Sequence, residues 1–226
     1  IALSFGIPLV VWGENSAFEY GDASEERMGF KLDSNWLKKY GVTHGTTATD
    51  WVDKELSAKE LTPYSGPSPD DLEKQGVLAV FLGYYFPWDV NTSYQTAKKH
   101  GFCVKSGETR TGIYDFADID DNFISIHHYI KWYKFGFTRS FDNLSLEIRN
   151  GRITRDEAIN KIASKGDETP YSDIEKFCDF TGITKKEFMQ IIEKFRNTKI
   201  WKQKKNGIWY MPDFLISDWE WEQNES

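Results

Sequence analysis

Cysteine is scarce in this chain of 226 residues, which contains only Cys103 and Cys178. Two widely separated cysteines make neither a disulfide framework nor a zinc site, and they are typical of a reduced, cytoplasmic protein. No apolar run approaches the roughly 20 residues that cross a bilayer, so we expect no membrane insertion. Basic residues are in the minority, because 28 Lys and Arg face 35 Asp and Glu. The formal net charge of −7 argues against binding nucleic acid through its phosphates.

Aromatic residues, by contrast, make up 16% of the chain and include 9 Trp and 16 Phe. A disordered chain is poor in aromatic residues, so this composition predicts a folded protein. The length is sufficient for one domain or slightly more and for a sizeable hydrophobic core.

Two apolar runs predict buried strands. Residues 7–12 follow a short helix that ends at Gly6, and residues 77–86 form the second run. Both runs are apolar on both faces, as in a parallel sheet covered by helices. Two strands do not make a stable doubly wound sheet. We therefore predict an α/β fold whose earlier strands and helices lie upstream of Ile1; the alternative is a small α+β domain with a two-stranded core.

The rest of the chain predicts mainly helices. A helical pattern runs from residue 118 to about 197, where three starts place a hydroxyl three residues before a Glu, at Thr154, Ser172 and Thr184. An Asn206-Gly207 pair predicts a hairpin. Shorter helices are expected at 34–39, 49–56, 70–74 and 91–99, with an edge strand at 102–105. These signals divide the chain into an α/β part (1–117), a helical subdomain with a terminal hairpin (118–210) and a tail (211–226).

Polar residues follow both predicted strands, at the edge where parallel sheets bind ligands. Glu14 and Asn15 come after the first strand, and Trp88 and Asp89 after the second. A carboxylate here can hold Mg²⁺ or orient a substrate amine, and an aromatic ring can stack on a base or sugar. The alternative is that Glu14 and Asp89 cap the helices that follow.

Two adjacent histidines lie on the helix predicted around residues 123–135. His127 shares a face with Lys134, whereas His128 lies about 100° around the helix. One histidine can therefore face a pocket while the other packs or is solvated. Because adjacent histidines on a helix diverge and no cysteine lies near them in the sequence, we expect no metal site.

Several cations stand close together after this helix in an otherwise acidic chain. They include Lys134, Arg139 and Arg149, and a cluster of this kind suits phosphate, since the guanidinium fork matches pairs of phosphate oxygens. The alternative is a solvated face with pairs such as Arg152 and Asp156.

At this point the residues carry a resemblance that spans nearly the whole chain, to about Trp209. The chain resembles the N-acetyl sugar amidotransferase family, which belongs to the PP-loop ATP pyrophosphatases. The motifs that carry the resemblance are Trp12-Gly13-Glu14-Asn15 with Glu19-Tyr20-Gly21, Tyr84-Tyr85-Phe86-Pro87-Trp88-Asp89, Arg110-Thr111-Gly112-Ile113-Tyr114-Asp115, His127-His128-Tyr129, Lys134-Phe135-Gly136-Phe137-Thr138-Arg139 and Glu147-Ile148-Arg149-Asn150-Gly151-Arg152-Ile153-Thr154-Arg155.

The resemblance implies an ATP- and Mg²⁺-dependent enzyme of surface polysaccharide (LPS O-antigen) synthesis that converts an acetamido group of a nucleotide-linked or nonulosonic sugar to an acetamidino group. Ammonia would come from a glutaminase and its synthase-like partner. The resemblance gives catalytic roles to Glu14, Asn15, His127 and His128. It gives substrate or phosphate contacts to Tyr20, Trp88, Asp89, Arg110, Tyr114, Lys134, Arg139 and Arg149.

The chain also departs from the family. The Ser-Gly-Gly-x-Asp-Ser loop that cradles the pyrophosphate and the family's N-terminal cysteines are not in this sequence, and we expect both upstream of Ile1. The chain as given is therefore expected to be inactive alone. Two other functions remain open: a PP-loop enzyme that modifies tRNA, which the acidic charge disfavours, and a non-catalytic helical interaction module that docks through exposed aromatic residues.

Overall fold

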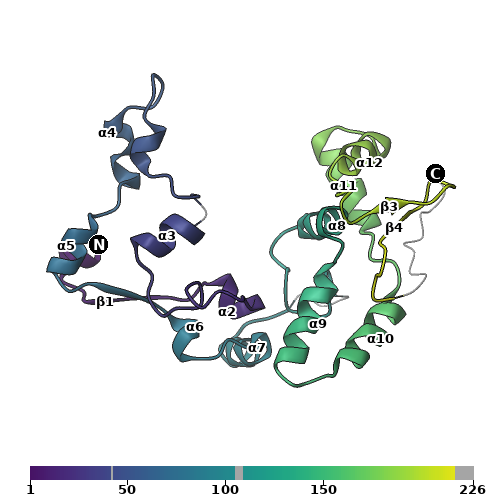
Figure 1. Ribbon diagram of the computed structural model, residues 1–226, viewed down its shortest axis with the longest axis horizontal. Helices are drawn as coiled ribbons and strands as arrows, with labels where there is room; N and C mark the ends of the chain where they lie inside the picture. Colours follow the sequence, from purple (N-terminus) through teal and green to yellow (C-terminus); the bar gives the residue numbers. More distant parts are fainter. Residues whose placement is uncertain (42, 105–108, 217–226) are drawn as a thin grey trace. The chain divides into compact units, whose positions relative to one another are not determined.

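The computed structural model describes residues 1–41, 43–104 and 109–216 and contains two compact units, Ile1–Ser93 and Tyr94–Ser226. Its class is mixed α/β, as predicted: a small parallel sheet in the first unit and a group of helices in the second (Figure 1). Residues 94–117 group by their contacts with the helical unit. The predicted division into domains at residues 117 and 210 stays a prediction.

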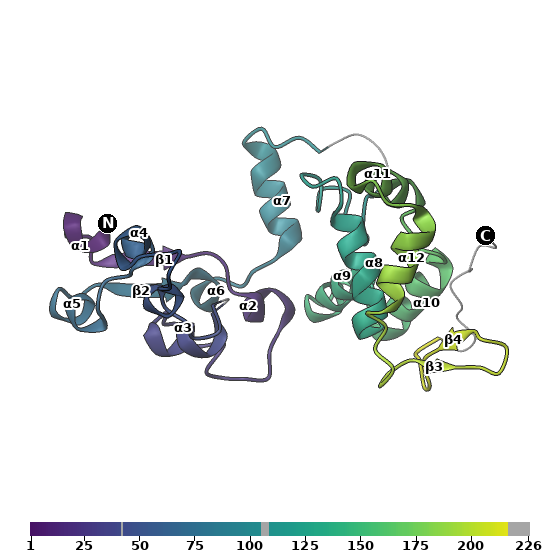
Figure 2. The same ribbon diagram turned by 90° about the horizontal axis from the view of Figure 1, so that it is seen from above.

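The sheet of the first unit consists of two parallel strands. The short helix α1 (Ala2–Phe5) ends at Gly6, whose φ of 63° and ψ of 33° are left-handed, as the sequence predicts. Strand β1 (Leu9–Trp12) follows and pairs in parallel with β2 (Leu78–Phe81), in a register that runs from Leu9 opposite Leu78 to Trp12 opposite Phe81 (Figure 2). The parallel pairing is confirmed.

The expectation that both faces of the first strand are buried is wrong for the described chain. Leu9, Val11 and Trp12 are each about half exposed, at 50%, 51% and 47%. Burial is concentrated at the end of β2, where Phe81 is 1% exposed and its ring centroid lies 4.8 Å from that of Trp36. With two strands and an aromatic cluster gathered at Phe81, the side chains of β1 lack a covering layer among the described residues.

The second apolar run is divided between two kinds of structure. The strand ends at Phe81, and residues Leu82–Tyr85 form helix α6, so the extended segment predicted to residue 86 is wrong beyond this point. A short apolar run has no periodicity that separates strand from buried helix. The other helices of the first unit are α2 (Ser16–Tyr20), α3 (Ser34–Tyr40), α4 (Ala58–Leu61), α5 (Pro69–Lys74) and 3₁₀ turns at Ala48–Trp51 and Thr62–Tyr64.

These elements confirm the predicted helices at 34–39 and 70–74, and helix α7 (Val90–Lys99) confirms the one at 91–99. The helix predicted at 49–56 is wrong in extent, because only the 3₁₀ turn Ala48–Trp51 forms there. Residues 102–104 are not in a strand, so the described part of the predicted edge strand is not confirmed.

The second unit is helical, as the capping and periodicity signals predict. Figure 2 shows α8 beside its neighbours, and a short antiparallel hairpin closes the unit. The elements are α8 (Ile124–Phe135), α9 (Arg139–Arg149), α10 (Arg155–Lys165), α11 (Tyr171–Thr181), α12 (Lys185–Glu193), β3 (Lys202–Gln203) and β4 (Trp209–Tyr210). The hairpin turn contains Gly207 with a φ of 87°, which confirms the Asn-Gly signal.

Apolar side chains of α8, α11 and α12 form the main core of this unit. Trp132 of α8, Ile174 of α11 and Ile192 of α12 are nearly completely buried in it. Trp201 closes the core, because its ring packs edge-on against Trp132 and its Nε1 donates a 3.0 Å hydrogen bond to the carbonyl of Tyr133. A smaller core joins α9 to α10 through Leu144, Ala158 and Ile162.

Two of the three predicted capping boxes are confirmed. Thr154 and Thr184 cap α10 and α12, and each exchanges hydrogen bonds with the Glu three residues later. The third prediction is wrong, because α11 begins at Tyr171 with Pro170 at its N-cap, which places Ser172 inside the first turn. Proline has no backbone N–H, so at the N-cap it leaves one fewer unpaired donor than another residue would.

This difference predicts unequal effects for two similar substitutions. Thr184→Ala should lower the free energy of unfolding by about 1 kcal/mol, because the N-cap hydroxyl is lost. Ser172→Ala, the matched control, should change it by less than about 0.5 kcal/mol, since Ser172 caps no helix. Urea unfolding followed by circular dichroism measures both, and equal losses would contradict the boundary at Tyr171.

Candidate functional site

Two of the polar residues that follow the strands, Asn15 and Asp89, act as helix caps, whereas the cap of α2 is not Glu14. Asn15 is buried at the start of α2, where its Oδ1 accepts from the N–H of Ala17 at 2.9 Å and its Nδ2 donates to the carbonyl of Arg27 at 3.1 Å. Asp89 accepts from the N–H of Asn91 at 3.2 Å and from Oγ1 of Thr92 at 2.8 Å. Both residues therefore serve as helix caps, which is the structural alternative to a catalytic role.

The other strand-end residues are placed differently. Glu14 is exposed next to Asn15, and Trp88 is half-buried beside Asp89. Tyr20 lies in α2, and its side chain is outside the described part of the structure.

The start of α2 offers no preformed phosphate site. Helix α2 has five residues, and the side chain of Asn15 occupies its N-cap, so no set of free backbone N–H groups is available to a phosphate. Across the described ranges 1–41, 43–104 and 109–216, no group of three or more His, Cys, Asp or Glu is placed to hold a metal ion. ATP and Mg²⁺ stay predictions, and we assign no chemical step to them at the strand ends.

In the second unit, the segment after residue 108 packs against α9. Gly112 has a φ of 61°, and a Cβ atom at this position would lie 2.0 Å from Oδ1 of Asn143. The same Oδ1 accepts a 3.0 Å hydrogen bond from the N–H of Ile113. Only glycine combines this backbone conformation with so close an approach. The Arg-Thr-Gly-Ile-Tyr motif is thus held on α9 by a buried amide.

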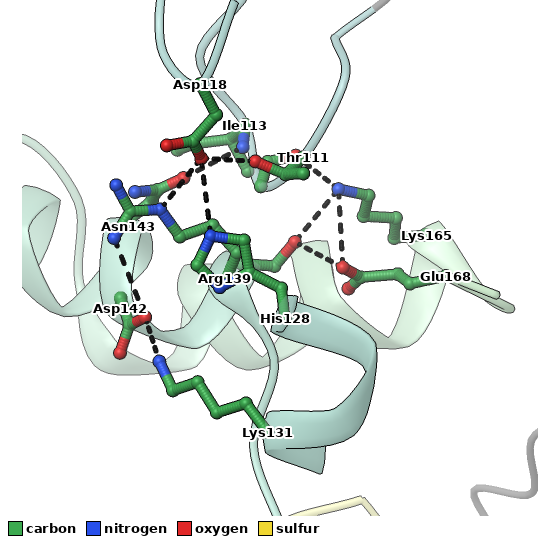
Figure 3. A network of polar contacts seen from close by, with 12 residues as sticks. Thr111, Ile113, Asp118, His128, Lys131, Arg139, Asp142, Asn143, Lys165 and Glu168 are labelled. Carbon is green, nitrogen blue, oxygen red and sulfur yellow. Dashed lines mark hydrogen bonds and ion pairs between the residues drawn. The ribbon is translucent and has the colours of Figure 1, made fainter. Parts of the chain in front are cut away.

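Asp118 connects this segment to α8 and α9 (Figure 3). Its Oδ2 accepts a 3.2 Å hydrogen bond from Nε of Arg139 and another from Oγ1 of Thr111. Nε2 of His128 lies 3.5 Å from the same oxygen, which is an ionic contact longer than an ordinary hydrogen bond. Burial alone would raise the pKa of Asp118, but the contacts with His128, Thr111 and Arg139 outweigh it and hold this pKa well below its usual range.

The contacts continue from Arg139 to a second carboxylate. Nη1 of Arg139 lies 3.8 Å from Oδ2 of Asp142, which also accepts a hydrogen bond from Nζ of Lys131. Thr111, Asp118, His128, Lys131, Arg139 and Asp142 form what we call the Asp118 cluster. In this cluster the two carboxylates balance the charges of Lys131 and Arg139.

A partly buried carboxylate, that of Glu168, joins the start of α9 to the segment after α10. Glu168 accepts hydrogen bonds from Thr138 at 3.1 Å and from Ser140 at 3.0 Å. Nζ of Lys165 lies 2.9 Å from Oγ of Ser140 and donates to the carbonyl of Gly112 (Figure 3). Lys165, Ser140 and Glu168 therefore form a second connection between the Arg-Thr-Gly-Ile-Tyr motif (the glycine motif) and the helices.

The two histidines diverge, as the helix geometry predicts. His127 is exposed, whereas His128 is turned inward with both ring nitrogens buried, and the ring centroids are 5.2 Å apart. Partial burial lowers the pKa of His127, and electrostatic interaction with His128, Lys131, Lys134 and Arg139 lowers it further. His127 is therefore a neutral, solvent-accessible imidazole at neutral pH, in electropositive surroundings.

The second unit contains the part of the chain that is similar to a known protein family. Residues 108–215 match the family described as LPS biosynthesis protein WbpG-like, C-terminal domain. We call the second unit WbpG-like because residues 108–215 are similar to that domain. A search of curated proteins found no match to the chain. In the described part of the chain, no helix has the length and apolar character needed to cross a membrane.

The remaining predicted site residues of the WbpG-like unit lie outside the Asp118 cluster. Nη2 of Arg110 is 3.3 Å from Oδ2 of Asp173, and the hydroxyl of Tyr114 donates to Glu147. Burial and the adjacent Glu147 carboxylate raise the pKa of Tyr114. Nζ of Lys134 lies 4.8 Å from the ring centroid of Phe195, and Arg149 is exposed at the end of α9.

Sequence reasoning missed several members of this arrangement. Asp118, Asn143, Lys165 and Glu168 carry most of its hydrogen bonds, yet none of them was singled out as a site residue. Asp118 falls in an irregular segment with a φ of 56°, so no periodicity marks it. The one available signal is Gly112, because a glycine between polar and apolar residues indicates a close backbone approach.

The glycine contact can be tested by a matched pair of substitutions. Gly112→Ala should lower the free energy of unfolding by about 3 kcal/mol or more, because the new methyl group meets Asn143 and the backbone is left-handed. Gly151→Ala has a φ of 67° but nothing within 4 Å, so it should cost only about 1 kcal/mol. Urea unfolding of both variants measures the difference, and equal losses would contradict the close approach.

The lowered pKa of Asp118 predicts a pH dependence. As the pH falls, the unfolded chain protonates this carboxyl first, so its stabilisation is complete above the ordinary aspartate pKa of about 3.9 and is lost below it. Asp118→Asn should cost about 2 kcal/mol at pH 7, and its deficit should shrink as the pH falls below 4. Asp115→Asn, which changes an exposed residue of the same segment, should cost little at either pH.

Proposed function

We propose that this chain is part of an N-acetyl sugar amidotransferase of LPS biosynthesis, and that its WbpG-like unit presents His127 as the proton acceptor beside an anionic sugar substrate. The match of residues 108–215 to an LPS biosynthesis family supports the pathway. The motifs along the chain, from Trp12-Gly13-Glu14-Asn15 onward, support the amidotransferase reaction. The observation that carries the site is the exposed, neutral imidazole of His127 among cations.

The amidotransferase reaction needs a proton acceptor. Replacing an amide oxygen by nitrogen requires neutral ammonia as the nucleophile. After the C–N bond forms, the attacking nitrogen is positively charged and must lose a proton, and the C–O bond to the activated oxygen then breaks to leave the acetamidino group. A general base must be unprotonated at the working pH before it can accept a proton. The lowered pKa of His127 meets this condition at neutral pH.

The surroundings of His127 also suit an anionic substrate. Lys131, Lys134 and Arg139 lie close enough to lower its pKa by their charge. A nucleotide-linked sugar carries phosphate charges, and a cationic surface raises its local concentration and its association rate. We assign direct phosphate contacts to Lys134 and Arg149. Arg139 is bound to Asp118 and Asp142, so its main role in the proposal is to hold α9 in position.

The remaining parts of the proposal rest on the family resemblance. ATP would activate the amide oxygen, and a glutaminase with its synthase-like partner would supply the ammonia. The role of Glu14, which is exposed after β1, stays a prediction of the resemblance. No described residue is assigned to ATP.

The test uses the enzyme as the cell makes it, with ATP, ammonium chloride and acetamido sugar nucleotides, and mass spectrometry of the sugar product. His127→Gln should lower kcat by about 100-fold, because general base catalysis contributes at least that much. Its activity should recover partly at high pH, where more of the ammonium is already deprotonated.

His100→Gln, which changes an exposed histidine outside the cluster, is the control and should leave kcat and its pH profile unchanged. A His127→Gln enzyme with normal kcat and the wild-type pH profile would contradict the role of His127. Failure of the unaltered enzyme to exchange the oxygen of any acetamido sugar would contradict the reaction itself.

A further inference from the structure

The C-terminal hairpin belongs to the most basic segment of this acidic protein. Residues 194–210 contain six cations and no Asp or Glu, whereas the chain as a whole has a formal net charge of −7. The cations are Lys194, Arg196, Lys199, Lys202, Lys204 and Lys205, and the five lysines are exposed. This concentration of charge is independent of the Asp118 cluster and plays no part in the proposed reaction.

One face of the hairpin is anchored to the helical core. The guanidinium of Arg196 lies over the rings of Tyr133, Trp201 and Trp209 at 4.2, 4.9 and 5.0 Å. Its charge is balanced by Glu193, which accepts hydrogen bonds at 2.6 and 2.8 Å. These contacts hold Trp209 toward the core and therefore set the orientation of the whole hairpin.

The other face presents lysine and tyrosine to solvent. Lys202 is directly opposite Tyr210 in the antiparallel pair, and residues in such a pair project to the same face. Nζ of Lys204 lies 5.9 Å from the ring centroid of Tyr210, which is 38% exposed. Lys205 follows in the turn. We call Lys202, Lys204, Lys205 and Tyr210 the hairpin face.

We propose that the hairpin face binds an anionic phospholipid surface. Each lysine close to such a surface contributes about 1 kcal/mol, and the attraction falls off within a Debye length. Tyrosine is favoured at the boundary between headgroups and hydrocarbon, where its ring is partly buried and its hydroxyl stays wet. Because the rest of the chain is acidic, the membrane would attract this face and repel others, so the protein would bind in one orientation.

Vesicle flotation of the full chain tests the proposal. The protein should float with vesicles of phosphatidylcholine and phosphatidylglycerol but not with phosphatidylcholine alone, and about 0.5 M NaCl should release it, because salt shortens the Debye length. The triple variant Lys202→Gln, Lys204→Gln, Lys205→Gln should bind at least about 100-fold more weakly, as expected for three lysines at a charged surface. Tyr210→Ser should also weaken binding at low salt, where the unaltered protein is bound.

The matched control removes the same charge from exposed lysines of the first unit, Lys54→Gln, Lys59→Gln and Lys74→Gln, and should leave vesicle binding unchanged. Circular dichroism of each variant checks that it remains folded. Equal binding by the two triple variants, no binding to the anionic vesicles, or tighter binding to a single-stranded oligonucleotide than to the vesicles would each overturn the proposal.

Discussion

The carboxylate of Asp118 joins segments that are distant in the sequence. Its Oδ2 contacts Thr111 in the glycine motif, His128 in α8 and Arg139 at the start of α9. A carboxylate that is 15% exposed is stable in this position only while such partners compensate the loss of water. The requirement acts in both directions, because each partner is also oriented by the carboxylate. The positions of α8, α9 and the segment before them therefore depend on one another.

This mutual dependence explains how the unit exposes a neutral base among cations. Arg139 and Lys131 are paired with carboxylates, so their charges are held in fixed positions rather than on mobile side chains. His128 is turned inward toward Asp118, which leaves His127, its neighbour on the helix, to face solvent. The electropositive surroundings that lower the pKa of His127 are thus a consequence of the packing around Asp118. A site built on helices in this way is more precisely held than one built on loops.

The two units differ in how completely their apolar residues are covered. In the helical unit, Trp132, Ile174 and Ile192 are nearly completely buried. In the first unit, β1 keeps half-exposed apolar side chains, and the described strand pair is too small to form a layer that is covered on both faces. The chemistry that we propose for the described residues accordingly rests on the helical unit, where side-chain positions are fixed by a continuous core.

Local interactions could be read directly from the order of the residues. A hydroxyl three residues before a Glu marks Thr154 and Thr184 as helix caps, and the angle between adjacent helical positions separates His127 from His128. These features involve neighbours within a few residues, so the sequence alone determined them. Long-range contacts were decided by the tertiary structure: Asn143 against Gly112 and Arg139 on Asp118 join residues about 20 to 30 positions apart. No periodicity encodes such pairs, because they form only once packing brings separate helices together and removes water from their polar groups.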